Sequence, residues 1–87
     1  MANITKENVL RCAKLAKEYE AARMELLGED IIGSAVSVRN RQQVKEIADA
    51  CGAEIVRKQY KSIAAYDVYV DGVLFFFTES SEPSEDF

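Results

Sequence analysis

Two cysteines, Cys12 and Cys51, are the side chains best suited to covalent chemistry in this chain of 87 residues. A cysteine becomes a nucleophile when a neighbouring base removes its proton, and histidine is the usual base. The chain contains no histidine, and its two cysteines do not form a Cys-x-x-Cys motif. We therefore expect both cysteines to be reduced, small apolar side chains without a catalytic role.

The carboxylates also offer little chemistry. Acid–base catalysis needs carboxylates held close together in a pocket, but the 15 Asp and Glu residues fall mostly on expected helix surfaces, a turn and the C-terminal end. The sequence has no glycine-rich phosphate loop and no metal-ligand spacing. A chain of this length also has little room for a substrate pocket. We expect a protein without enzymatic activity, metal or cofactor.

Charge is distributed unevenly along the chain, whose net charge is −4. Residues 39–61 contain six basic and three acidic residues, whereas residues 62–87 contain six acidic residues and no basic one. Such asymmetry steers partners of matching charge but does not specify a fold.

The chain shows no segment for export or membrane insertion. Its longest apolar run, Val73–Phe77, is far shorter than the roughly 20 residues that span a bilayer. The N-terminus lacks the basic end and apolar run of a signal peptide. Together with the cysteines expected to be reduced, these features indicate a cytoplasmic protein.

A first helix is expected between the capping residue Thr5 and the terminating Gly28. Within it, apolar residues recur at alternating spacings of three and four: Cys12, Leu15, Tyr19, Ala22 and Leu26. Such a stripe either packs on the protein's own sheet or a neighbouring helix, or forms a short coiled coil.

A second helix is expected to start between Ser37 and Asn40 and to stop at Gly52. Its apolar face consists of Val44, Ile47, Ala48 and Cys51. Residues 29–37 connect the two helices and leave room for a short strand.

A β-hairpin is expected around Asp71-Gly72, a pair typical of two-residue type I′ turns. That turn places Val70 opposite Val73 and Tyr69 opposite Leu74, and side chains then alternate between the two faces. The expected core face carries Val68, Val70, Val73, Phe75, Tyr66 and Phe77. The second face carries Ala65, Asp67, Tyr69, Leu74, Phe76 and Thr78, and is too apolar to be purely solvated. Whether the first helix covers it is open.

Residues 53–64 fit either a strand or a helix. As a helix they would complete the element order of a winged helix-turn-helix protein. This alternative function is DNA binding through the basic residues Arg39, Arg41, Lys45, Arg57, Lys58 and Lys61. Against it, Lys58 stands where a recognition helix needs a buried apolar residue. As a strand, they would form a three-stranded meander with the hairpin.

We favour the strand, and with it an α+β domain over residues 1–78. It has two N-terminal helices and an antiparallel sheet of at least three strands that ends in a β-hairpin. Residues 79–87 are acidic and without periodicity, which is typical of a disordered tail.

The helix end at Cys51-Gly52-Ala53-Glu54 and the run YDVYVDGVLFF at residues 66–76 resemble small uncharacterised proteins of phages and mobile elements from gut Firmicutes. The resemblance covers the second half of the chain. It implies an origin among genes that often encode inhibitors of host defence, including anti-CRISPR proteins. It implies no particular partner and no site residues.

Binding to a host protein is therefore the expected function. The expected surface is the second hairpin face, with Asp67, Tyr69, Leu74 and Phe76, because exposed aromatic side chains with a charged rim are typical of interface hot spots. If the partner is a nucleic-acid-binding nuclease, acidic residues would occupy its positively charged channel: Glu79, Glu82, Glu85 and Asp86. An exposed strand edge would also allow two copies to pair as a homodimer.

Overall fold

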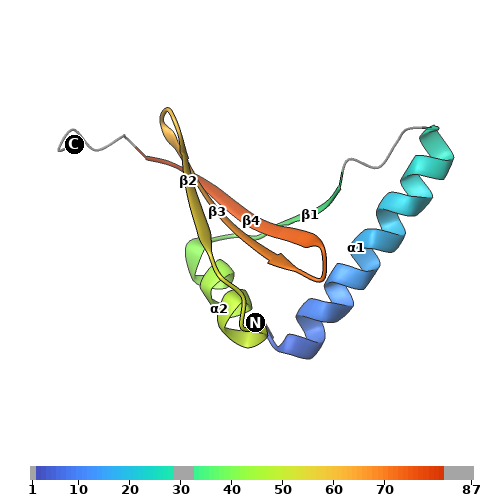
Figure 1. Ribbon diagram of the computed structural model, residues 1–87, viewed down its shortest axis with the longest axis horizontal. Helices are drawn as coiled ribbons and strands as arrows, with labels where there is room; N and C mark the ends of the chain where they lie inside the picture. The colour runs from blue at the N-terminus through green and yellow to red at the C-terminus, as the bar shows by residue number, and fades with distance from the viewer. Residues whose placement is uncertain (1, 29–32, 82–87) are drawn as a thin grey trace.

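The computed structural model of the protein describes residues 2–28 and 33–81 (Figure 1). Its elements follow the order α1 (Lys6–Leu27), β1 (Ser34–Ser37), α2 (Arg41–Cys51), β2 (Val56–Tyr60), β3 (Ile63–Val70) and β4 (Val73–Ser80). The four strands form one sheet in the order β1-β4-β3-β2. Strands β2, β3 and β4 make the antiparallel meander, and β1 adds a parallel strand beside β4. The predicted α+β class is confirmed.

Helix α1 begins after its predicted capping residue, Thr5, and α2 begins after Asn40, within the predicted range. The Oγ1 atom of Thr5 accepts a hydrogen bond from the backbone N–H of Asn8 at 3.1 Å. At the start of α2, Oδ1 of Asn40 accepts from the N–H of Gln43 at 2.8 Å. The Gln43 side chain in turn accepts from the N–H of Arg39 at 2.8 Å. Each cap satisfies backbone donors of the first turn that have no partner inside the helix.

The segment 53–64 contains β2 and the turn into β3, and no part of it is helical. Val56 pairs with Asp67 and Tyr60 with Ile63 in antiparallel register. A helix here would leave the backbone groups of this side of β3 without strand partners. The described residues therefore do not form the third helix that a winged helix-turn-helix protein uses to contact DNA.

Both helices pack on the same face of the sheet. The buried core consists of Val9 and Ala13 from α1, Val44, Ile47 and Ala48 from α2, and Val68, Val70, Val73 and Phe75 from the hairpin. The four hairpin residues lie on one face because the predicted register is confirmed, from Val70 opposite Val73 outward. The first helix thus covers the expected core face and not the second face.

The hairpin extends further than predicted. Strand β4 continues through Ser80, and the N–H of Ser81 donates to the carbonyl oxygen of Ser62 at 2.8 Å. The sheet therefore includes Glu79 and Ser80, which lie beyond the predicted domain end at residue 78. Residues 82–87 of the predicted tail lie outside the described residues.

Neither of the two described helices is long and apolar enough to cross a membrane.

Candidate protein-binding surface

We call the sheet surface opposite the helices the open face. The strand register assigns to it Ala35 and Ser37 of β1, Val56, Lys58 and Tyr60 of β2, Ile63, Ala65, Asp67 and Tyr69 of β3, and Leu74, Phe76 and Thr78 of β4. The buried residues of both helices pack on the other side of the same strands. The open face is thus free of helical cover in the described part of the chain.

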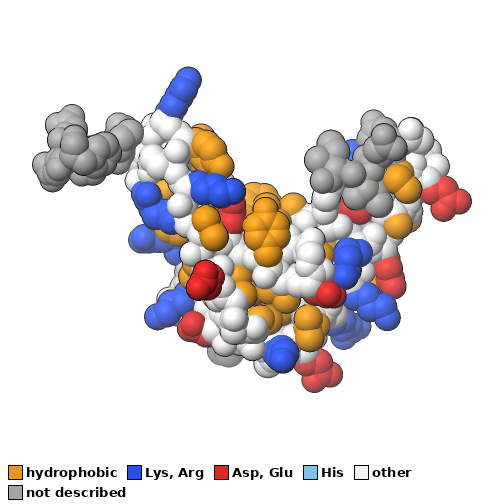
Figure 2. Space-filling view, in the orientation of Figure 1, with side chains coloured by type: hydrophobic (Ala, Val, Ile, Leu, Met, Phe, Trp, Pro, Cys, Tyr) orange, Lys and Arg blue, Asp and Glu red, His pale blue; other side chains and the backbone are white. Residues whose placement is uncertain are grey.

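Large apolar side chains are exposed across the open face. Tyr69 is 58% exposed, Tyr60 56%, Ile63 47% and Val56 45%. Leu74 and Phe76 are half-buried among these neighbours. Figure 2 shows hydrophobic side chains gathered over the strands in the middle of the view. Several large apolar side chains exposed on one surface commonly mark a binding site.

An ion pair lies within this apolar surface. Asp67 is 7% exposed, and its carboxylate lies 3.5 Å from the ammonium group of Lys58 on the neighbouring strand. Val56 and Phe76 flank Asp67 on the two adjacent strands. The charge of Asp67 is therefore held near the middle of the open face, and not in a charged rim around the aromatic residues.

The structure brings together four of the eight residues predicted to bind a partner. Asp67, Tyr69, Leu74 and Phe76 lie on adjacent positions of β3 and β4 and share the open face. Glu79 lies on the opposite face, because it is an odd number of residues from Phe76 along β4. The other three acidic residues, Glu82, Glu85 and Asp86, lie outside the described residues.

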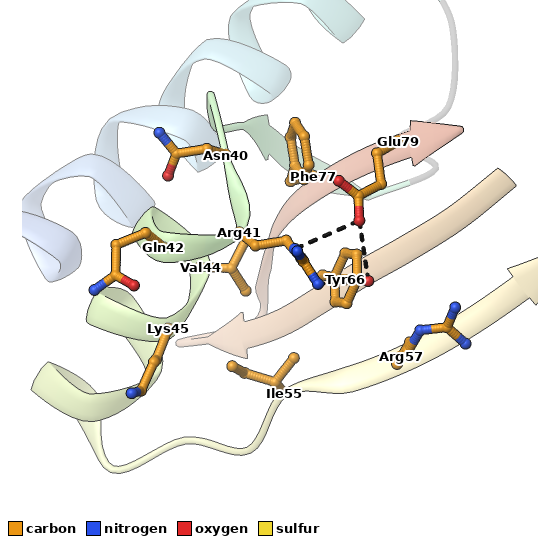
Figure 3. A pocket seen from close by; sticks show the side chains of 10 residues that line it. All are labelled: Asn40, Arg41, Gln42, Val44, Lys45, Ile55, Arg57, Tyr66, Phe77 and Glu79. Carbon is orange, nitrogen blue, oxygen red and sulfur yellow. Dashed lines mark hydrogen bonds and ion pairs between the residues drawn. The ribbon is translucent and has the colours of Figure 1, made fainter. Parts of the chain in front are cut away.

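A basic pocket lies on the helix side of the sheet, between α2 and the strands (Figure 3). It has a volume of about 700 Å3 and contains three cationic side chains, those of Arg41, Lys45 and Arg57. The guanidinium groups of Arg41 and Arg57 lie 5.4 and 5.8 Å from the centre of the Tyr66 ring. Such distances allow cation–π attraction.

Glu79 partly neutralises this basic pocket. Its carboxylate accepts a hydrogen bond from the Tyr66 hydroxyl at 3.1 Å and lies 3.4 Å from Nε of Arg41. Arg57 instead donates to the side chain of Gln59 at 2.9 Å. Glu79 therefore has an intramolecular role in the basic pocket.

The six residues of the DNA-binding alternative are divided between different surfaces. Arg41, Lys45 and Arg57 line the basic pocket, whereas Lys58 lies on the open face. Arg39 precedes α2, and Lys61 lies in the turn between β2 and β3. The sheet separates Lys58 from the three cations of the basic pocket, so the six residues do not form one continuous basic surface.

The surface expected from the sequence did not include the contribution of β2 and of the start of β3 to the open face. Val56 and Tyr60 lie on the open face with Lys58 because side chains alternate along a strand. Their place beside Asp67 and Ile63 follows once the turn at 61–62 pairs the two strands. The alternating pattern of 56–60 was the available signal.

The described residues include no group of three or more Cys, Asp or Glu side chains placed to hold a metal ion. Comparison with protein-family models, curated proteins and solved structures finds no match to this chain. The geometry of the open face and of the basic pocket is therefore the basis for assigning a function.

Proposed function

We propose that this protein is a non-enzymatic binding module that attaches to a protein partner through its open face. The observation that carries the proposal is the exposure of Tyr69, Tyr60, Ile63 and Val56 on a sheet surface that neither helix covers. Antiparallel sheets commonly have one solvated face, but that face is normally polar. Here the solvated face is largely apolar.

The chemistry of the open face suits protein recognition. Tyrosine is enriched among the residues that dominate binding energy, because its ring buries a large area and its hydroxyl retains a polar partner. The pair Lys58–Asp67 lies among the apolar residues. A charge pair within an apolar contact penalises partners that lack complementary groups, and so favours specificity.

As the partner we propose a host defence nuclease. This part of the proposal rests on the resemblance of the hairpin sequence to phage proteins and on the acidic composition near the C-terminus. The open face would supply affinity, while Glu82, Glu85 and Asp86 would approach the nucleic-acid channel of the nuclease. Glu79 is not included, because it pairs with Arg41 and Tyr66.

The test uses the tagged full chain in a nuclease-treated Firmicutes lysate, followed by titration of the purified captured protein. Tyr69→Glu is the main variant, because Tyr69 is 58% exposed and its replacement should leave the fold intact. We expect Tyr69→Glu to weaken binding at least about tenfold, since an aromatic anchor is lost and a charge is buried at the contact.

The matched control is Ala21→Glu, which adds the same charge at an exposed position of α1 away from the sheet. It should bind like the wild type, and circular dichroism should show both variants folded. Equal binding by wild type and folded Tyr69→Glu would exclude the open face as the site. Loss of nucleic-acid cleavage by the captured protein in the presence of this chain would support the nuclease as partner, and unchanged cleavage would contradict it.

A further inference from the structure

Most of helix α1 is solvated, including its apolar stripe. Only Val9 and Ala13 of its 22 residues are buried. Along the stripe, Leu15 is 54% exposed, Tyr19 67% and Leu26 81%. In Figure 1 the C-terminal end of α1 stands clear of β3 and β4. The stripe predicted from the sequence is therefore real. Cys12 packs against the core, but the described sheet does not cover Leu15, Tyr19 or Leu26.

The contact between α1 and the body ends near the middle of the helix. The ammonium group of Lys17 lies 2.9 Å from the carboxylate of Asp71 in the hairpin turn. After Lys17, every residue of α1 except Glu20 is exposed. A helical segment this short is marginal in water unless it packs an apolar face against another element. The exposed half of α1 therefore needs another element against which its apolar side chains can pack.

The spacing of the stripe specifies the form of that partner. Cys12, Leu15, Tyr19, Ala22 and Leu26 follow the alternation of positions a and d in a coiled coil, with Cys12, Tyr19 and Leu26 at a. A groove of about 560 Å3 runs beside the stripe, between α1 and the edge strand β1. A second helix can approach the stripe from this groove.

We propose that α1 pairs with α1 of a second copy of this chain as a short parallel coiled coil. The charges that flank the stripe favour this partner and this orientation. Glu18 occupies position g and Arg23 position e, five residues later, and these positions face each other across a parallel dimer. Two-fold symmetry forms the Glu18–Arg23 attraction twice.

The antiparallel register that pairs Leu15 with Leu26 has the opposite electrostatics. When Leu15 packs against Leu26 of the other copy, position g of one helix faces position g of the other, and Glu18 meets Glu25. Two like-charge contacts would then replace two attractive ones. Arg23 already lies 3.7 Å from Glu20 of its own helix, and position e leaves it beside the seam. Of these two arrangements, the charges support the parallel dimer.

The first test is sedimentation of the full chain over about 10 to 500 µM, since a contact of about two heptads is weak. Wild type should shift from monomer to dimer as concentration rises. Leu26→Glu should lower the association constant at least about tenfold, because it places a charge in the apolar seam. Ala21→Glu, on the other side of the helix, should dimerise like wild type. A wild type that stays monomeric throughout, or dimerisation unaffected by Leu26→Glu, would overturn the proposal.

The second test reverses the flanking charges and distinguishes the two orientations. Glu18→Arg alone and Arg23→Glu alone should each weaken dimerisation about three- to tenfold, whereas an equal mixture of the two variants should recover it as a heterodimer. An antiparallel pair would be strengthened by Glu18→Arg, because the introduced guanidinium group would then face Glu25 of the other helix. That result, or a mixture that fails to recover, would refute the parallel dimer.

Discussion

At the scale of single residues, the pair Lys58–Asp67 is the feature with the clearest energetic consequence. The side chain of Asp67 is 10% exposed, and that of Lys58 is 43% exposed. Lys58 is the one cation that pairs with this carboxylate in the described part of the chain. A charge so enclosed is costly without its partner, whereas the pair as a whole contributes little.

We expect Lys58→Met to lower the free energy of unfolding by about 1 to 2 kcal/mol, because it leaves the Asp67 carboxylate uncompensated. Adding Asp67→Leu should recover most of the loss, since the apolar neighbours of Asp67 accommodate a leucine. Urea denaturation measures both effects. Lys61→Met is the matched control, because Lys61 is an exposed turn lysine. If Lys58→Met is as stable as this control, the Lys58–Asp67 pair makes no contribution to the free energy of unfolding.

At the scale of elements, the β3–β4 turn fixes the register of the whole hairpin. Asp71 and Gly72 both have left-handed backbones, with φ of 53° and 78°. An added Cβ at Gly72 would meet no atom within 4 Å, so a substitution there affects only backbone conformation. We expect Gly72→Ala to lower the free energy of unfolding by about 1 kcal/mol.

The control for this turn is Asp71→Asn. Asparagine tolerates the left-handed conformation, so this variant should lose only the exposed ion pair with Lys17, which is worth about 0.5 kcal/mol or less. Thermal or urea unfolding compares the two variants. If Asp71→Asn costs as much as Gly72→Ala, the ion pair and not the turn conformation dominates.

The elements also show which parts of the fold a sequence can reveal. The hairpin register was predictable because a two-residue turn determines every pair that follows it. The parallel contact of β1 with β4 joins segments far apart in the chain, such as Ser34 and Val73, and no local pattern indicates it. Likewise, periodicity located the stripe on α1 but could not say what covers it.

The same limit applies to the candidate sites. Tyr69, Leu74 and Phe76 were found because they belong to one local hairpin. The basic pocket was not, because Arg41 and Arg57 come together over the Tyr66 ring only when β2 pairs with β3.

At the scale of the whole molecule, the division of the cations between two faces bears on nucleic-acid binding. The basic pocket can present at most three cations, Arg41, Lys45 and Arg57, to a phosphate backbone. Each neutralised phosphate contributes about −0.9 to the slope of log K against log salt. We expect any binding to duplex DNA to be weak, with a slope no steeper than about −3.

Fluorescence anisotropy of a labelled duplex at several salt concentrations measures this slope. The double variant Lys45→Gln/Arg57→Gln should remove most of the binding that remains. Two results would mean that the protein contacts DNA through a surface other than this pocket. One is a slope of about −6, and the other is unchanged binding by the double variant.

The position of β4 has a consequence for the order in which the protein folds. This strand lies between β1 and β3, yet it is the last described element of the chain. During synthesis, both helices and the strands β1, β2 and β3 leave the ribosome before β4. Only β4 can join β1 to the rest of the sheet. The local hairpin should then form first and capture β1 across a long loop, whose closure is entropically costly and slow. A chain that ends before Val73 lacks the middle of its sheet, and not merely an edge.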